Sequence, residues 1–192
     1  ATIRRQRQMC IRDRIDTHIH ADHISALNEL NKRTNCIRVM GEKSKSEVID
    51  LRIKDGEKIK VEEVELQAIY TPGHTDCSYS FLMNDRVFTG DTLLINGSGR
   101  TDFQNGNAYD AYDSIFNKLL KLPEKTLVFP AHDYNGKKFS TIENEKNNNP
   151  RLQVSSKEEY ADIMNNLNLA NPKMMDVAVP ANVKGLTLDN IN

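Results

Sequence analysis

Hydrophobic and polar positions alternate along the chain in short blocks that predict strands and helices in turn. Ile24, Leu27 and Leu30 recur at a spacing of three residues, which predicts a helix over about 23–33. Runs rich in β-branched and aromatic residues, bounded by Gly, Pro, Asn or Asp, predict strands at 15–17, 36–40, 58–61, 64–70, 78–83, 86–89 and 126–129.

Two further helices are predicted in the second half of the chain. An apolar face runs from Tyr112 to Leu120 and ends at Pro123. A capping-box pattern at 155–159 predicts a final helix through about Leu167. The glycines between 97 and 106 predict a long flexible loop. Because no repeat or linker interrupts the alternation, we interpret residues 15–192 as one α/β domain.

Composition narrows the class of protein. The chain has 192 residues, of which 38% are hydrophobic and 28% charged, with a net charge of −1, so a soluble globular domain is expected. A balanced charge argues against a nucleic-acid-binding protein, and the apolar runs are too short to predict a membrane span. Cys10, Cys36 and Cys77 form no CxxC pair, which favours a reducing compartment, either the cytoplasm or, in a eukaryote, the mitochondrial matrix.

The first 14 residues differ from the rest. They contain five arginines and one aspartate, and they lack the apolar core of a secretory signal. We interpret residues 1–14 as a non-native or disordered segment outside the domain.

The placement of histidine carries the chemistry. Three of the five histidines, His18, His20 and His23, lie in one six-residue run with Asp22. His74, Asp91 and His132 each follow a predicted strand directly. A lone histidine after a strand is ordinarily structural, but this cluster is costly to fold without a ligand. Imidazole and carboxylate together suit zinc, iron or manganese, so we predict a metal site at the strand ends.

These motifs resemble the metallo-β-lactamase superfamily. The segments THIHADH (17–23), TPGHT (71–75), FTGD (88–91) and PAHDY (130–134) occur in the order typical of it. The run 88–103 and the tail segments NPR (149–151) and AVPAN (178–182) are similar to its persulfide dioxygenase branch, which is related to glyoxalase II.

The resemblance implies an αββα sandwich and one iron(II) per chain. Its metal ligands fall on His18, His74 and Asp91, a set that leaves positions open on a single iron. His20, Asp22, His23 and His132 are then implied to orient the ligands and the reactants by hydrogen bonds. In the hydrolytic relatives, these four side chains complete a second metal site.

The implied reaction is the oxidation of glutathione persulfide by O₂ and water to sulfite and glutathione. Arg100 matches a glutathione-contacting arginine of the family, and Tyr134 matches a residue that faces substrate or oxygen. Glutathione carries two carboxylates, and a guanidinium can hold a carboxylate by two hydrogen bonds.

Two alternatives stay open. A glyoxalase II-type hydroxyacylglutathione hydrolase has the same scaffold with a binuclear zinc or other metal site. The chain could also be the metal-binding half of a fusion with a sulfurtransferase domain. The expected partners are glutathione persulfide and O₂, with no nucleic acid or membrane, and a homodimer and a sulfurtransferase are left open.

The fold implies more sheet than the chain supplies. In this fold several strands precede the first metal motif, whereas here that motif begins at Thr17. We therefore expect a sandwich that is truncated at its N-terminus, with its first strands missing.

Overall fold

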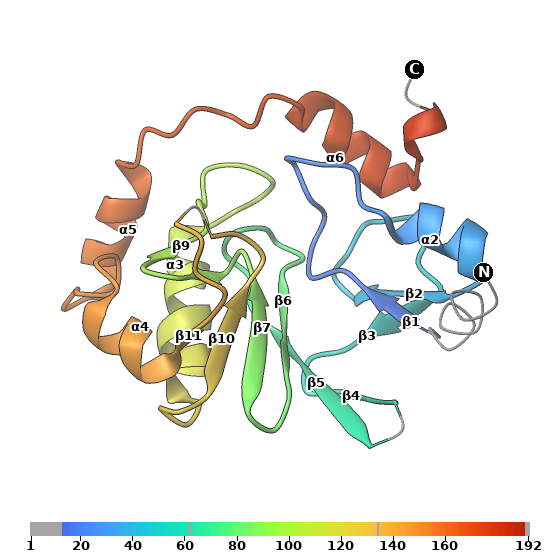
Figure 1. Cartoon of the computed structure of the whole chain (residues 1–192). Helices are drawn as coiled ribbons and strands as arrows, with labels where there is room; N and C mark the ends of the chain where they lie inside the picture. The colour runs from blue at the N-terminus through green and yellow to red at the C-terminus, as the bar shows by residue number, and fades with distance from the viewer. Residues whose placement is uncertain (1–12, 62, 134, 191–192) are drawn as a thin grey trace.

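The computed structural model describes residues 13–61, 63–133 and 135–190, and Figure 1 shows them as four layers, in the order helices, sheet, sheet, helices. The expected αββα sandwich is thus confirmed. Tyr134 and residues 1–12 lie outside the described residues.

The smaller sheet has three parallel strands in the order β1-β2-β3. Its strands are β1 (Asp13–Ile15), β2 (Ile37–Gly41) and β3 (Leu51–Ile53). Helix α2 (Leu27–Thr34) connects β1 to β2, and it begins four residues later than the pattern predicted, because residues 23–25 remain in the metal loop. Strand β1 begins at Asp13, inside the segment that we expected to lie outside the domain.

The larger sheet has six strands in the order β11-β10-β7-β6-β5-β4. The strands are β4 (Lys58–Val61), β5 (Val64–Tyr70), β6 (Tyr79–Leu82), β7 (Arg86–Gly90), β10 (Leu127–Pro130) and β11 (Ser140–Thr141). The predicted hairpin is confirmed by the antiparallel pairing of β6 with β7. Strands β5, β7 and β10 point the same way, so their carboxyl ends lie at one edge.

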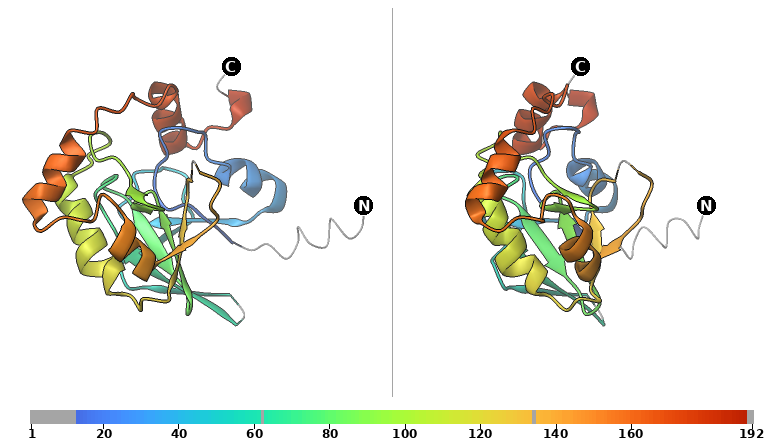
Figure 2. Two further views of the ribbon diagram at one scale, coloured as in Figure 1. Left: turned by 60° about the vertical axis from the view of Figure 1, so that its left-hand side comes forward. Right: turned by 90° about the vertical axis from the view of Figure 1, so that its left-hand side faces the viewer.

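The remaining elements cover the sheets. They are the short hairpin β8 (Leu93–Leu94) and β9 (Gly97–Ser98), the helices α3 (Ala108–Tyr112), η1 (Asp113–Lys118), η2 (Leu119–Lys121), α4 (Ile142–Asn148), α5 (Lys157–Asn165) and α6 (Met175–Lys184), and the turn η3 (Leu188–Asn190). Ser156 caps α5 by accepting a hydrogen bond from the backbone of Glu159, as the capping-box pattern predicted. Figure 2 shows α3 and α5 on one side of the sheets and α2 and α6 on the other.

Three buried apolar clusters hold the layers together. The first, which includes Val87, Ile115 and Val128, lies between the six-stranded sheet and helices α3, η1 and α5. The second, which includes Val39 and Phe81, lies between the two sheets. The third joins α2 and α6 to the small sheet. Close packing of these faces fixes the strand ends that carry the predicted ligands.

Two sequence-based expectations were wrong. Helix α5 is not the last helix, because α6 follows it despite Pro180 in its interior. The glycine-rich segment is not a loose loop: Gly99 is buried, and a Cβ there would lie 2.0 Å from the carbonyl oxygen of Asp91. Gly99 is therefore required for close packing against the metal motif. In the described part of the chain, no helix is long and apolar enough to cross a membrane.

Candidate metal centre

Four loops at the carboxyl ends of strands bring the predicted ligands together. The loop after β1 carries the histidine cluster, and the loops after β5, β7 and β10 carry His74, Asp91 and His132. A tight turn at Gly90 introduces Asp91: Gly90 has φ of +53°, and a Cβ there would lie 2.7 Å from Oγ1 of Thr17. The structure thus brings these predicted site residues together at the strand ends.

His18, His74 and Asp91 form the inner group. One ligand atom of each lies within 4.8 Å of the other two. Asp91 Oδ2 is 3.7 Å from Nε2 of His18 and 3.5 Å from Nε2 of His74. The side chain of His18 is only 1% exposed and that of Asp91 11%. This is the arrangement that the 2-His-1-carboxylate prediction requires.

Hydrogen bonds orient the two inner histidines. Nδ1 of His74 donates to the backbone carbonyl of Arg100 at 2.8 Å, so in the neutral ring the lone pair is on Nε2, facing Asp91. Nδ1 of His18 lies 2.9 Å from the hydroxyl of Thr17. A backbone carbonyl or hydroxyl on the far nitrogen is the usual support for a metal-binding imidazole.

Two buried polar atoms of the centre, one from each group of ligands, are unsatisfied. Asp91 Oδ1 and His20 Nδ1 are buried and have no hydrogen-bond partner among the described residues. Buried polar atoms normally have partners, and a lone pair of His74 faces a carboxylate oxygen. A cation between Nε2 of His74 and the carboxylate of Asp91 would satisfy both groups, so the residues present fit a divalent metal.

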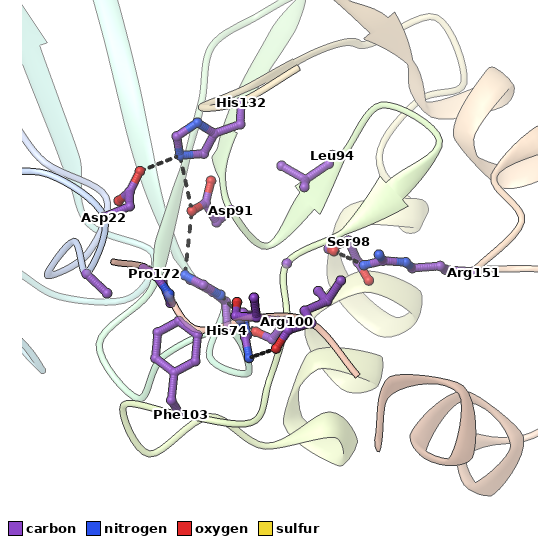
Figure 3. A pocket seen from close by; sticks show the side chains of 14 residues that line it. Asp22, His74, Asp91, Leu94, Ser98, Arg100, Phe103, His132, Arg151 and Pro172 are labelled. Carbon is purple, nitrogen blue, oxygen red and sulfur yellow. Dashed lines mark hydrogen bonds and ion pairs between the residues drawn. The ribbon is translucent and has the colours of Figure 1, made fainter. Parts of the chain in front are cut away.

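A second, more exposed group lies beside the first. His20, Asp22 and His23 offer ligand atoms within 4.8 Å of one another. Nε2 of His132 is 3.4 Å from Asp22 Oδ2 and 3.6 Å from Asp91 Oδ2, so it lies between the two groups (Figure 3). All the predicted site residues that the structure describes therefore surround one centre, except Arg100.

His18 and His20 are held in the neutral form. Burial, and then the neighbouring histidines, lower the pKa of His18 well below its ordinary value. Burial, and then His23, lower the pKa of His20 to about 4. Neutral imidazoles are the form that binds a metal.

The centre opens into a cavity of about 570 Å³ (Figure 3). Apolar side chains form much of its wall, among them Leu94, Phe103, Leu169 and Pro172. This volume suits a ligand of roughly peptide size. Arg100 and Arg151 both line the cavity.

Arg100 is committed to intramolecular bonds. Its guanidinium donates twice to the Asp102 carboxylate, at 2.6 Å each, and it stacks over Phe103 at 4.7 Å. It also donates to the carbonyls of Leu169 and Ala170, in the segment that joins α5 to α6. The predicted contact of Arg100 with glutathione stays a prediction. It requires Arg100 to give up some of these intramolecular bonds in favour of bonds to the substrate.

Arg151 is a pocket residue that the sequence analysis did not select. One guanidinium nitrogen donates to the carbonyl of Ser98, and no carboxylate among the described residues forms an ion pair with Arg151. Burial lowers the pKa of this guanidinium, but arginine stays charged in proteins. A half-buried cation with unused donors is suited to bind an anionic group. The sequence signal that could have selected Arg151 is the NPR segment (149–151), which is similar to the persulfide dioxygenase branch.

Comparisons with known proteins identify the family. Residues 41–132 match the sequence model of the metallo-beta-lactamase superfamily. The human protein named "Persulfide dioxygenase ETHE1, mitochondrial" is 44% identical over 173 residues, which are 88% of this chain and 67% of that protein. The chain belongs to the persulfide dioxygenase branch of the metallo-β-lactamase superfamily.

Two further comparisons support this branch. The crystal structure of ETHE1 from Myxococcus xanthus superposes with a TM-score of 0.89 at 45% identity, and covers 95% of this chain and 83% of that one. A hydroxyacylglutathione hydrolase of Buchnera aphidicola is 36% identical over 119 residues, which are 62% of this chain and 46% of that protein. The persulfide dioxygenase branch thus matches more of the chain at higher identity than this hydrolase does.

The depressed pKa values of His18 and His20 predict acid sensitivity of the metal-free protein. The folded pKa of His20 lies below its unfolded value, so stability is complete above about pH 6.5 and falls as the pH drops toward 4. For His20 alone we expect a loss of about 2 kcal/mol in the free energy of unfolding between pH 7 and pH 5. Urea unfolding at several pH values measures it.

His20→Asn is the control for this prediction, because it removes the titrating ring and should reduce the slope. Burial raises the pKa of the Asp16 carboxyl, which acts in the opposite direction, so the comparison of the two chains isolates the histidine. An identical pH dependence in both chains would contradict the prediction.

Proposed function

We propose that this protein is an iron-dependent persulfide dioxygenase that oxidises glutathione persulfide with O₂ and water to sulfite and glutathione. The observation that carries the proposal is the inner group of two imidazoles and one carboxylate at the wall of a cavity that Arg151, which keeps unused donors, also lines. Membership of the persulfide dioxygenase branch supports the substrate class.

His18, His74 and Asp91 would hold the iron. An iron(II) bound by this set supplies open positions for a sulfur anion and for O₂. The protein's own part is to bind, orient and desolvate the reactants. Leu94 and Phe103 give the cavity an apolar wall that would reduce hydration of the reactants, and the neutral His18 and His20 leave the site free of competing protons at neutral pH.

Arg151 would bind one carboxylate of glutathione. Figure 3 shows Arg151 across the cavity from Asp22 and His132, so a ligand with its anionic end at Arg151 extends toward the metal centre. An elongated thiol with terminal carboxylates fits this arrangement, because one carboxylate would bind Arg151 while the sulfur lies at the metal centre.

A hydroxyacylglutathione hydrolase is the second candidate. The group His20, Asp22 and His23, with His132 next to it, would support a second metal and hence a bridging hydroxide. The relative from Buchnera aphidicola carries that name. Metal stoichiometry and oxygen consumption separate the two candidates.

We further propose a reducing compartment, either the cytoplasm or a mitochondrial matrix. Cys36 and Cys77 are buried free thiols, and the mammalian relatives are named mitochondrial. A sulfurtransferase that makes or uses persulfides is the proposed functional partner.

The first prediction is the reaction itself. With glutathione persulfide the iron-loaded protein should consume O₂ and release sulfite, and with lactoylglutathione it should release no thiol. An oxygen electrode and a thiol assay measure both, with Asp91→Ala as the inactive control. Thioester hydrolysis without oxygen uptake would favour the hydrolase.

The second prediction concerns metal content. Anaerobically purified protein should contain about one iron per chain, because one facial triad binds one ion. Asp91→Ala should lose the metal, since Asp91 Oδ2 lies near Nε2 of both inner histidines. His132→Ala should keep it, and elemental analysis of the three proteins decides. Two tightly held zinc ions per chain would refute the assignment.

The third prediction concerns Arg151. Arg151→Ala should raise KM for glutathione persulfide by roughly 10- to 100-fold with little change in kcat, because a charged hydrogen-bonded contact remote from the sulfur binds ground and transition states alike. Arg86→Ala is the matched control, since Arg86 pairs with Asp85 and does not line the cavity. A persulfide without carboxylates should show no such increase; an equal increase would mean that Arg151 acts only on the fold.

A further inference from the structure

Helix α6 contacts the metal loop through one buried side chain. Asn182 is 8% exposed and lies among the residues that follow β1. Its amide nitrogen donates to the backbone carbonyls of His20 and His23, at 2.9 Å each. Its amide oxygen accepts from the backbone N–H of Ser25 at 2.8 Å. One side chain thus bonds to three backbone groups of a six-residue stretch.

The chemistry of the partners fixes the orientation of this amide. Rotated by half a turn, the oxygen would face two carbonyl oxygens and the nitrogen would face an N–H group. Both donors and one acceptor are therefore matched only in the observed orientation. An aspartate of the same shape would place a carboxylate against two carbonyls, so the site selects an amide.

Residues 20–25 belong to no strand or helix, so no regular backbone hydrogen bonding fixes their conformation. Asp22, in the centre of this stretch, reaches Nε2 of His132 at 3.4 Å, and the same nitrogen lies 3.6 Å from Asp91. The Ser25 hydroxyl in turn donates to Asp16, whose carboxylate is 4.0 Å from Nε2 of His20. Displacement of this stretch would therefore move groups that surround the inner ligands.

Helix α6 is itself anchored independently of the Asn182 amide. Val179 and Val183 pack against the cluster of Ile19, Leu27 and Met40. The backbone N–H of Glu47 donates to the carbonyl of Val183 at 2.8 Å. A change at Val183 can thus loosen the helix while the amide bonds to the loop remain.

We propose that Asn182 is a positioning residue of the metal centre: from α6 it holds the loop 20–25 so that its side chains support the inner ligands, and it thereby sets the affinity of the site for metal. The proposal rests on the metal site of the proposed function, but on neither its substrate nor its reaction.

Titration of the metal-free full chain with Co²⁺, followed by the visible d–d absorption, tests it. Asn182→Ala and Asn182→Asp should each weaken Co²⁺ binding by about tenfold or more and shift the d–d bands, since loss of groups that orient metal ligands costs roughly 10- to 100-fold in affinity. Val183→Ala should lower Tm by packing loss but leave the bands unchanged and the Kd within about twofold.

The outcomes separate positioning from simple stabilisation. Asn182 variants that lose Tm but bind Co²⁺ with the wild-type Kd and spectrum would overturn the proposal, as would a Val183→Ala chain that loses affinity equally. The titration involves no persulfide or oxygen, so a protein that shows the predicted Kd differences but consumes no O₂ supports the role of Asn182 while refuting the dioxygenase assignment.

Discussion

The Asp91 carboxylate is the group on which the architecture of the site depends. Its Oδ2 atom lies 3.5–3.7 Å from Nε2 of His18, His74 and His132, which come from three other loops. Asp91 is almost buried, and its second oxygen has no hydrogen-bond partner among the described residues. Burying such an atom costs about 1–3 kcal/mol when it is left unsatisfied. The packed sandwich tolerates this cost at the strand ends, and a bound cation would offset it.

The sandwich supplies the rigidity that this convergence needs. Strands β5, β7 and β10 end at one edge of the six-stranded sheet, and β1 ends opposite them in the smaller sheet. The backbone N–H of Tyr79 donates to the carbonyl of Thr17 at 2.9 Å, which ties the histidine loop directly to the larger sheet. Gly90 and Gly99 allow the loops to approach more closely than any side chain would permit. The ligands are thus placed by backbone packing before any metal binds.

The closeness of His74 and Asp91 could be predicted from the sequence, because each follows a strand and the strand ends at one edge of a sheet are neighbours. His18 follows β1 of the smaller sheet, and its place among the ligands came from the resemblance to the family. The roles proposed for Asn182 and Arg151 could not be predicted in the same way, since their partners are distant: Asn182 bonds to a loop 157–162 positions away. Pro180 also disfavours a helix around Asn182, and tertiary packing of α6 overrides that local preference. Tyr134 lies outside the described residues, so its predicted role stays a prediction.

The two cavity arginines show why residue type alone does not assign a role. Arg100 matched the family pattern, yet its donors bind Asp102 and the carbonyls of the segment between α5 and α6. That segment supplies Leu169 and Pro172 to the cavity wall, so in this arrangement Arg100 shapes the pocket. Arg151 makes a single side-chain bond, to a carbonyl, and keeps donors for an anion. A substrate carboxylate that bound Arg100 would take donors from the carbonyls of Leu169 and Ala170, because a carboxylate is the stronger acceptor. Loss of these bonds would release the segment between α5 and α6 from the cavity wall. Recognition by Arg151 needs no such rearrangement.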